Sequence, residues 1–205
     1  MTAPHQHTAE RRGRPGNDRN DVVIAAVALF NQHGYEATSV GMIADRLDVS
    51  KSAIYHHVAS KEELLAEALD RALSSLEQAL NAASPAQPTS ATEHRQRLEN
   101  LLRATVEVLV EELPSVTLLL RLRGNTDLER AALERRRQFD HAVSSLVDDA
   151  AAAGAVVTGR DTRAITRLVF GMINSIIEWY RPGGSLDARR LGDVVVSLVF
   201  DGLCP

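Results

Sequence analysis

One short run of the chain carries side chains that can bind both phosphates and base edges. Lys51, Ser52, Tyr55 and His56 supply a cation, a hydroxyl, a phenol and an imidazole. At helical spacing these four side chains point away from the apolar side of the helix. Tyr55 and His56 would donate to backbone phosphates, while Lys51, Ser52 and the small Ala53 would face base edges, where Ala53 can touch a thymine methyl. The run therefore predicts a helix that enters the major groove of DNA.

Two short helices joined by a tight turn would present that surface. Ser39, after Thr38, is the predicted N-cap of the first helix, and Ser50 is the predicted N-cap of the second, over residues 51–57. Asp48 and Val49 form the turn between them. The inward positions of the first helix are Val40, Ile43, Ala44 and Leu47. The spacing predicts a helix-turn-helix over about residues 39–58.

Helix N-termini beside this motif are further candidates for phosphate contact. The first turns at Ser39 and Lys61 would offer backbone N–H groups, and Lys61 adds a positive charge. His56 and His57 are adjacent, so on a helix their side chains diverge by about 100° and form a poor metal pair. We predict no metal site, no catalytic residue and no cofactor.

A basic segment precedes the motif. Arg11, Arg12 and Arg14 lie beside Gly13 and Pro15 in a polar stretch, residues 1–16, that is predicted to be a disordered tail. A glycine-flanked arginine pair suits the narrow minor groove of A·T-rich DNA. An ordinary solubilising tail is the alternative. Next to a helix-turn-helix, we favour DNA contact.

Composition excludes several classes of protein. The 205 residues are 44% hydrophobic and 24% charged, with Cys204 the single cysteine, so neither a disulfide framework nor a multi-cysteine zinc site is expected. No apolar run approaches the roughly 20 residues of a membrane span, and no signal peptide is evident. We expect a soluble cytoplasmic protein. It lacks the G-x-S-x-G, phosphate-loop and His/Glu metal patterns of enzymes.

Periodicity predicts an all-α fold with about nine helices and no strand. Three capping boxes mark helix starts, at Ser60 with Glu63, Ser90 with Glu93, and Thr126 with Glu129. A short apolar helix is expected over 116–123. We divide the chain into a head, residues 17–80, and a helical body, residues 81–205. The head with its tail is mildly basic and the body acidic, within a net charge of −4.

The head resembles the DNA-binding domain of the TetR regulators, which are helix-turn-helix proteins. The resemblance rests on Phe30, Gly34-Tyr35, Ala37-Thr38-Ser39-Val40, Ile43-Ala44, Leu47, Val49-Ser50, Ile54-Tyr55-His56-His57 and Ser60-Lys61-Glu62-Glu63-Leu64-Leu65. Two positions depart from the family pattern: Val58 replaces the usual aromatic residue, and Gly41 replaces a commonly charged one. The resemblance implies a homodimer that binds a double-stranded palindromic operator.

In the body, residues 178–184 (EWYRPGG) and the Leu/Val-rich end resemble actinobacterial regulators of steroid and acyl-CoA catabolism. This implies a repressor released from its operator by a small effector, with acyl-CoA or a related acid favoured. The predicted effector-binding residues are Arg121, Arg123, Phe139, Phe170, Asn174, Glu178 and Trp179. The last two apolar helices would form the subunit interface, with Gly171 and Gly192 allowing close approach. A helix-turn-helix dimer without a ligand, acting as an architectural protein or an activator, is the alternative.

Overall fold

The computed structural model describes residues 18–83, 88–156 and 161–202. The predicted basic tail, with Arg11, Arg12 and Arg14, lies outside these residues. Within them the protein is all-α, as predicted, and forms no strand. The helices are α1 (Arg19–His33), α2 (Val40–Leu47), α3 (Lys51–His57), α4 (Lys61–Ala82), α5 (Ala91–Glu111), α6 (Leu113–Leu120), α7 (Asp127–Ala152), α8 (Thr162–Asn174), α9 (Ile176–Trp179) and α10 (Ala188–Phe200). Because Ser175 alone separates α8 from the short α9, the expectation of about nine helices is met.

Side-chain caps begin the long helices where the sequence predicts them. The hydroxyl groups of Ser60, Ser90 and Thr126 each accept a hydrogen bond from the backbone N–H three residues later. The glutamate half of each box reaches one residue further back than expected: Glu63 accepts from Ala59 N–H at 2.6 Å, for example. The sequence analysis missed one complete box, Asp18 with Asp21, at the start of α1.

The helix α6 begins earlier than predicted. It spans Leu113–Leu120 and not residues 116–123. Pro114 stands in its first turn, where a missing N–H costs no hydrogen bond, so the proline belongs to the helix start. The C-cap is Arg121, which leaves Arg121 and Arg123 beyond the last helical turn.

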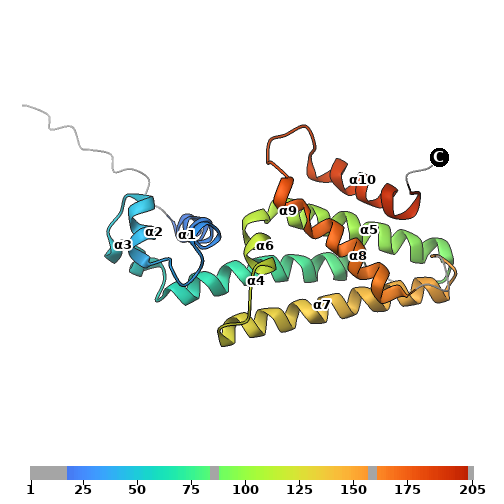
Figure 1. Cartoon of the computed structure of the whole chain (residues 1–205), viewed down its shortest axis with the longest axis horizontal. Coiled ribbons are helices and arrows are strands. Elements are labelled where there is room, and N and C mark those ends of the chain that lie inside the picture. Colours follow the sequence, from blue (N-terminus) through green and yellow to red (C-terminus); the bar gives the residue numbers. More distant parts are fainter. Residues whose placement is uncertain (1–17, 84–87, 157–160, 203–205) are drawn as a thin grey trace, which may run out of the picture.

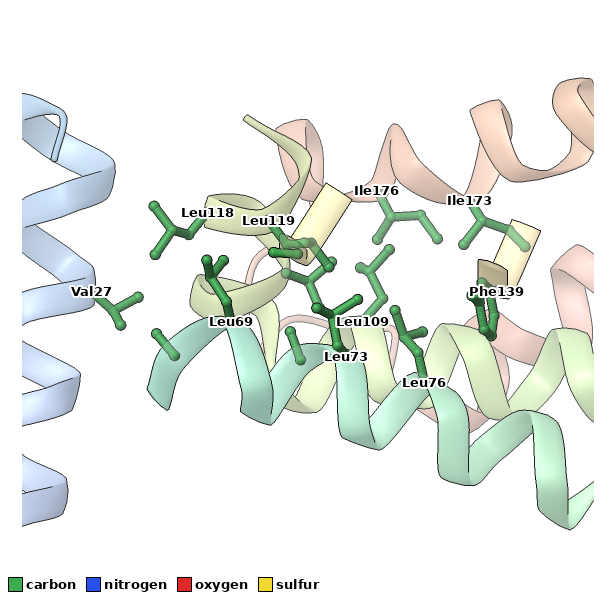
Figure 2. Close-up of a cluster of buried hydrophobic side chains, with 14 of the residues drawn as sticks. Val27, Leu69, Leu73, Leu76, Leu109, Leu118, Leu119, Phe139, Ile173 and Ile176 are labelled. Atoms are coloured by element: carbon green, nitrogen blue, oxygen red, sulfur yellow. The ribbon is translucent and has the colours of Figure 1, made fainter. Parts of the chain in front are cut away.

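The helix α4 joins the two ends of the molecule (Figure 1). The three short helices α1, α2 and α3 cluster at one end, and α4 runs from that cluster into the body between α5 and α7. One continuous apolar core follows it. Figure 2 shows Val27 of α1, Leu69 of α4 and Leu118 of α6 at the junction, and Phe139 of α7 and Ile173 of α8 deeper in the body. Burial of these side chains supplies the main stabilising free energy of the fold.

The C-terminal helix α10 packs on α5 through a glycine. A Cβ atom at Gly192 would lie 3.3 Å from the Cα atom of Arg103. Gly192 therefore allows a close approach of α10 to α5 within the chain, and its predicted place at a subunit interface stays a prediction. A Cβ at Gly171 would meet no heavy atom within 4 Å.

Two absences hold for residues 18–83, 88–156 and 161–202. None of their helices combines the length and apolarity needed to cross a bilayer. They contain no group of three or more His, Cys, Asp or Glu side chains placed to hold a metal ion.

Candidate nucleic-acid interface and ligand cavities

The helix α3 exposes most of its polar side chains. Ile54 is its one buried residue. Lys51, Ser52, Tyr55 and His56 are exposed, with 55% of Tyr55 accessible to solvent, and Ala53 is half-buried. The predicted outward set thus forms one polar surface. A tyrosine this exposed on a short helix is available to an external partner.

Local hydrogen bonds fix the turn that aims α3. The Ser39 hydroxyl accepts from Met42 N–H at 3.2 Å, and the Ser50 hydroxyl accepts from Ala53 N–H at 3.1 Å. Between the helices Asp48 has a φ of 55°, the left-handed conformation that aspartate tolerates better than most side chains. The predicted turn is confirmed. Because the Ser39 hydroxyl caps its own helix, backbone N–H groups are the better phosphate donors there.

Arg19 ties α3 to its neighbours. Its guanidinium donates to the His57 carbonyl at the end of α3 and forms ion pairs with Glu63 and Glu67 of α4, at 2.6 and 2.8 Å. The hydrogen bond from Arg19, followed by the N–H of Ala59, lowers the pKa of the Glu63 carboxyl. Since α3 buries a single side chain, this contact is a main restraint on its orientation. The role of Arg19 was not predicted, because nothing in the local sequence distinguishes it from a solvated arginine.

The Lys61 ammonium contacts the protein itself. It donates to the Tyr35 carbonyl at 2.8 Å and lies 4.1 Å from the centre of the Tyr35 ring. That ring meets Phe30 edge to face at 5.2 Å between centroids. An ammonium has three donors, so two remain for a phosphate. Lys61 thus links the end of α1 to the start of α4.

Gly41 makes room for Lys51. A Cβ at position 41 would lie 2.7 Å from Cε of Lys51 and 3.2 Å from its Nζ. The lysine stem therefore lies across α2 at the glycine. This contact gives a structural role to a residue that departs from the family pattern.

Three cavities meet at Phe170 in the body. A mainly apolar cavity of about 200 Å³ lies among α5, α7, α8 and α10. A polar groove of about 590 Å³ runs between α7 and α8. A third space, of about 30 Å³, touches Leu76 of α4, Leu109 of α5 and Leu119 of α6. Phe170 lines all three, and its ring meets Phe139 edge to face at 5.9 Å.

The structure brings together only part of the predicted effector set. Phe139, Phe170 and Asn174 line these spaces. The other four residues line none of the three. Arg121 forms an exposed ion pair with Glu178 at 3.6 Å, Trp179 is 50% exposed, and Arg123 is exposed beyond the end of α6.

The groove contains arginines that the sequence analysis did not select. Arg136 of α7 and Arg163 and Arg167 of α8 line it. The sequence indicates this cationic surface only through the four-residue spacing of Arg163 and Arg167, since that spacing puts both side chains on one helix face. It was weak, because exposed arginines are usually solvated.

Two family models match the chain. The model described as bacterial regulatory proteins, tetR family, matches residues 23–68, which include the whole helix-turn-helix. The model described as tetracyclin repressor-like, C-terminal domain, matches residues 91–203, more than half of the chain.

Known proteins are similar over nearly the full length. SCO3833 from Streptomyces coelicolor, a member of the TetR regulator family, has 50% identity and a TM-score of 0.80, covering 90% of this chain and 91% of its own. The transcriptional repressor KstR2 of Mycolicibacterium smegmatis is 24% identical over 93% of this chain and 92% of its own. AibR, solved with isovaleryl coenzyme A and operator DNA, shares the fold, with 20% identity and a TM-score of 0.72 over 89% and 97% of the two chains. The chain belongs to the TetR family of bacterial transcriptional regulators.

Proposed function

We propose that this chain is a homodimeric repressor that binds a palindromic DNA operator and leaves it when a small effector binds. One observation carries the DNA-binding part. The helix α3 buries only Ile54 and presents a polar, cationic surface, and Arg19 anchors its C-terminal end. A helix held by polar contacts at its ends, with its long face exposed, is suited to a major groove.

Each residue of the proposed interface has a role. Lys51, Ser52 and Ala53 read base edges, and Tyr55 and His56 donate to phosphates. The N-terminal turns at Ser39 and Lys61 also bind phosphates. The arginines Arg11, Arg12 and Arg14, which precede the described residues, enter the minor groove.

A second copy of the chain is proposed to cover the apolar surface of the C-terminal helices. Of the large hydrophobic side chains that are exposed in the described residues, most lie in 168–194: Leu168, Trp179, Leu186 and Val194. Leu168, on α8, is 74% exposed. Twofold pairing there would place two copies of α3 about one DNA turn, ~34 Å, apart.

The effector is proposed to occupy the cavities around Phe139, Phe170 and Asn174. Leu76 of α4 lines the smallest of them, so an occupant near Phe170 acts on the helix that leads to the head. An acyl-CoA is the favoured class, and the fold of AibR is known to hold one beside operator DNA. A division into a head of residues 17–80 and a body of residues 81–205, with α4 shared, belongs to this proposal, as does a protein that is not an enzyme.

The alternative is a dimer without an effector, acting as an architectural protein or an activator.

Selection of operators from random duplexes, followed by fluorescence anisotropy, tests DNA binding. We expect a palindrome and tight binding that weakens as salt rises. Because Lys51 reads base edges, Lys51→Gln should weaken operator binding and relax the sequence preference at the bases that it contacts. Arg130→Gln, whose arginine pairs with Asp127 at 2.5 Å in the first turn of α7, is the charge-matched control.

A further inference from the structure

Three arginines face the groove between α7 and α8 without a carboxylate partner. Among the described residues, no ion pair or side-chain hydrogen bond engages Arg136, Arg163 or Arg167. Two other arginines of the body are paired with carboxylates. Arg135 binds Glu77 at 2.9 Å, and Arg103 binds Asp193 at 2.8 Å.

The lining of the groove is cationic overall. Four arginines line it against two aspartates, Asp140 and Asp148. One aspartate is already engaged, since the Thr162 hydroxyl donates to Asp148 at 2.5 Å. Burial raises the pKa of the Asp140 carboxyl, against the opposing effect of nearby Arg136. Ser144 and Ser145 add hydroxyl donors to the same wall.

The unpaired charges are spread along the groove. The helix α8 contacts α7 and runs back at an oblique angle from the C-terminal end of α7 (Figure 1). On α8, Arg163 and Arg167 are four residues apart, a rise of about 6 Å, and Arg136 lines the groove from α7. Several separate cations match an anion with several phosphates better than one carboxylate. Guanidinium groups bind phosphate oxygens by paired hydrogen bonds.

An apolar cavity adjoins the same groove. Thr166 and Phe170 line both spaces. The Thr166 hydroxyl donates to the Thr162 carbonyl at 2.9 Å, so its proton is already used. The remaining lining includes Leu102, Val143 and Val199. Its volume of about 200 Å³ lies below the ~300–1,000 Å³ of pockets for drug-sized ligands, which favours a short acyl group.

We propose that the α7–α8 groove binds the phosphate-bearing end of a coenzyme A thioester, held by Arg136, Arg163 and Arg167, while the short acyl group enters the apolar cavity past Thr166 and Phe170. This assignment rests on the proposed function and specifies its effector as an extended polyanion with a small apolar end. Free fatty acids and neutral ligands lack the extended polyanion.

Calorimetric titration of the purified full-length protein with butyryl-CoA, CoA and butyrate tests the phosphate site in the groove and the acyl site in the cavity separately. We expect butyryl-CoA to bind tightest, CoA at least tenfold more weakly, and butyrate not measurably. Arg163→Gln and Arg167→Gln should each weaken both CoA-bearing ligands about tenfold, which matches the loss of one charge-assisted contact. Val199→Phe should reduce butyryl-CoA affinity to that of CoA. The control Arg130→Gln should change neither.

Operator binding measured on the same preparations distinguishes failure of the proposed CoA site from failure of the proposed DNA-binding function. If butyryl-CoA binds equally to wild type and to the Arg163→Gln/Arg167→Gln variant, the groove is not the phosphate site. If neither CoA ligand binds while the operator does, the effector class is wrong and the DNA-binding function stands. If operator binding is absent as well, the proposed function fails. Sedimentation of each variant checks that the oligomeric state is unchanged.

Discussion

Arg135 on α7 holds the Glu77 carboxylate on α4 at two points, with Nε 3.0 Å from Oε1 and Nη2 2.9 Å from Oε2. The same guanidinium reaches Asp70 of α4 at 2.8 Å through Nη1. These contacts raise the pKa of Arg135 and lower that of Asp70. They fasten the helix that lines the groove to the helix that carries the head.

Arg135→Gln should destabilise the protein by about 1 kcal/mol, since a paired, two-point contact exceeds an ordinary surface ion pair but remains solvated. Arg137→Gln, which removes a pair with Glu134 on the same helix, should cost less than about 0.5 kcal/mol. Urea unfolding of both variants gives the comparison. Equal losses would mean that the link between helices adds nothing.

Acid should weaken the attachment of α3 and α4 to α1. The pKa of Glu63 is lowered in the folded protein, chiefly by the Arg19 hydrogen bond. Its contribution is therefore fully present above its ordinary pKa of 4.5 and is lost as pH falls through the lower, folded value. The difference in unfolding free energy between wild type and Glu63→Gln should shrink as pH falls from 6 to 3. A difference independent of pH would contradict the assignment.

Gly41→Ala should leave the fold intact but change DNA binding. Alanine gains up to about 1 kcal/mol of helix stability over glycine. Its Cβ would push the Lys51 side chain, a flexible end, from its position 2.7 Å away. We expect weaker operator binding with undiminished thermal stability. In a Lys51→Ala background, Gly41→Ala should no longer change operator affinity. If it still does, the loss of affinity does not act through Lys51.

Gly192→Ala should destabilise the packing of α10 on α5. The added Cβ would meet the Arg103 backbone at 3.3 Å, which must move. Overpacking costs about 1–3 kcal/mol, and the helix preference of alanine offsets up to about 1 kcal/mol. Ser197→Ala, at an exposed position of the same helix, should be neutral within about 0.5 kcal/mol. A stabilised Gly192→Ala variant in chemical unfolding would show that α10 is free to shift.

The sequence was most informative where local chemistry decides the structure. Ser39, Ser50 and Ser60 cap helices at the predicted residues, because a side-chain cap and the next few residues suffice to start a helix. The turn at Asp48 follows for the same reason. The start of α6 was predicted three residues too late, at Val116, although Pro114 suits the first turn of a helix.

The ligand cavities depend on which helix faces meet, and no local pattern encodes that. Phe139 and Phe170 were selected as aromatic residues of the body, and the structure places them together. Arg121 and Glu178 were selected on similar grounds and pair with each other at the surface. Arg136 and Arg163 are far apart in sequence and meet at one groove only because α8 folds back along α7.

Operator affinity measured with and without an effector tests the account most directly. A fluorescent duplex carrying the selected palindrome is titrated with the full-length protein, first alone and then with saturating butyryl-CoA. The account predicts that the effector weakens operator binding about 100-fold, equivalent to about 2.7 kcal/mol of differential affinity between the two states. Operator affinity that stays unchanged while calorimetry shows butyryl-CoA bound would contradict the coupling between the α7–α8 groove and α3.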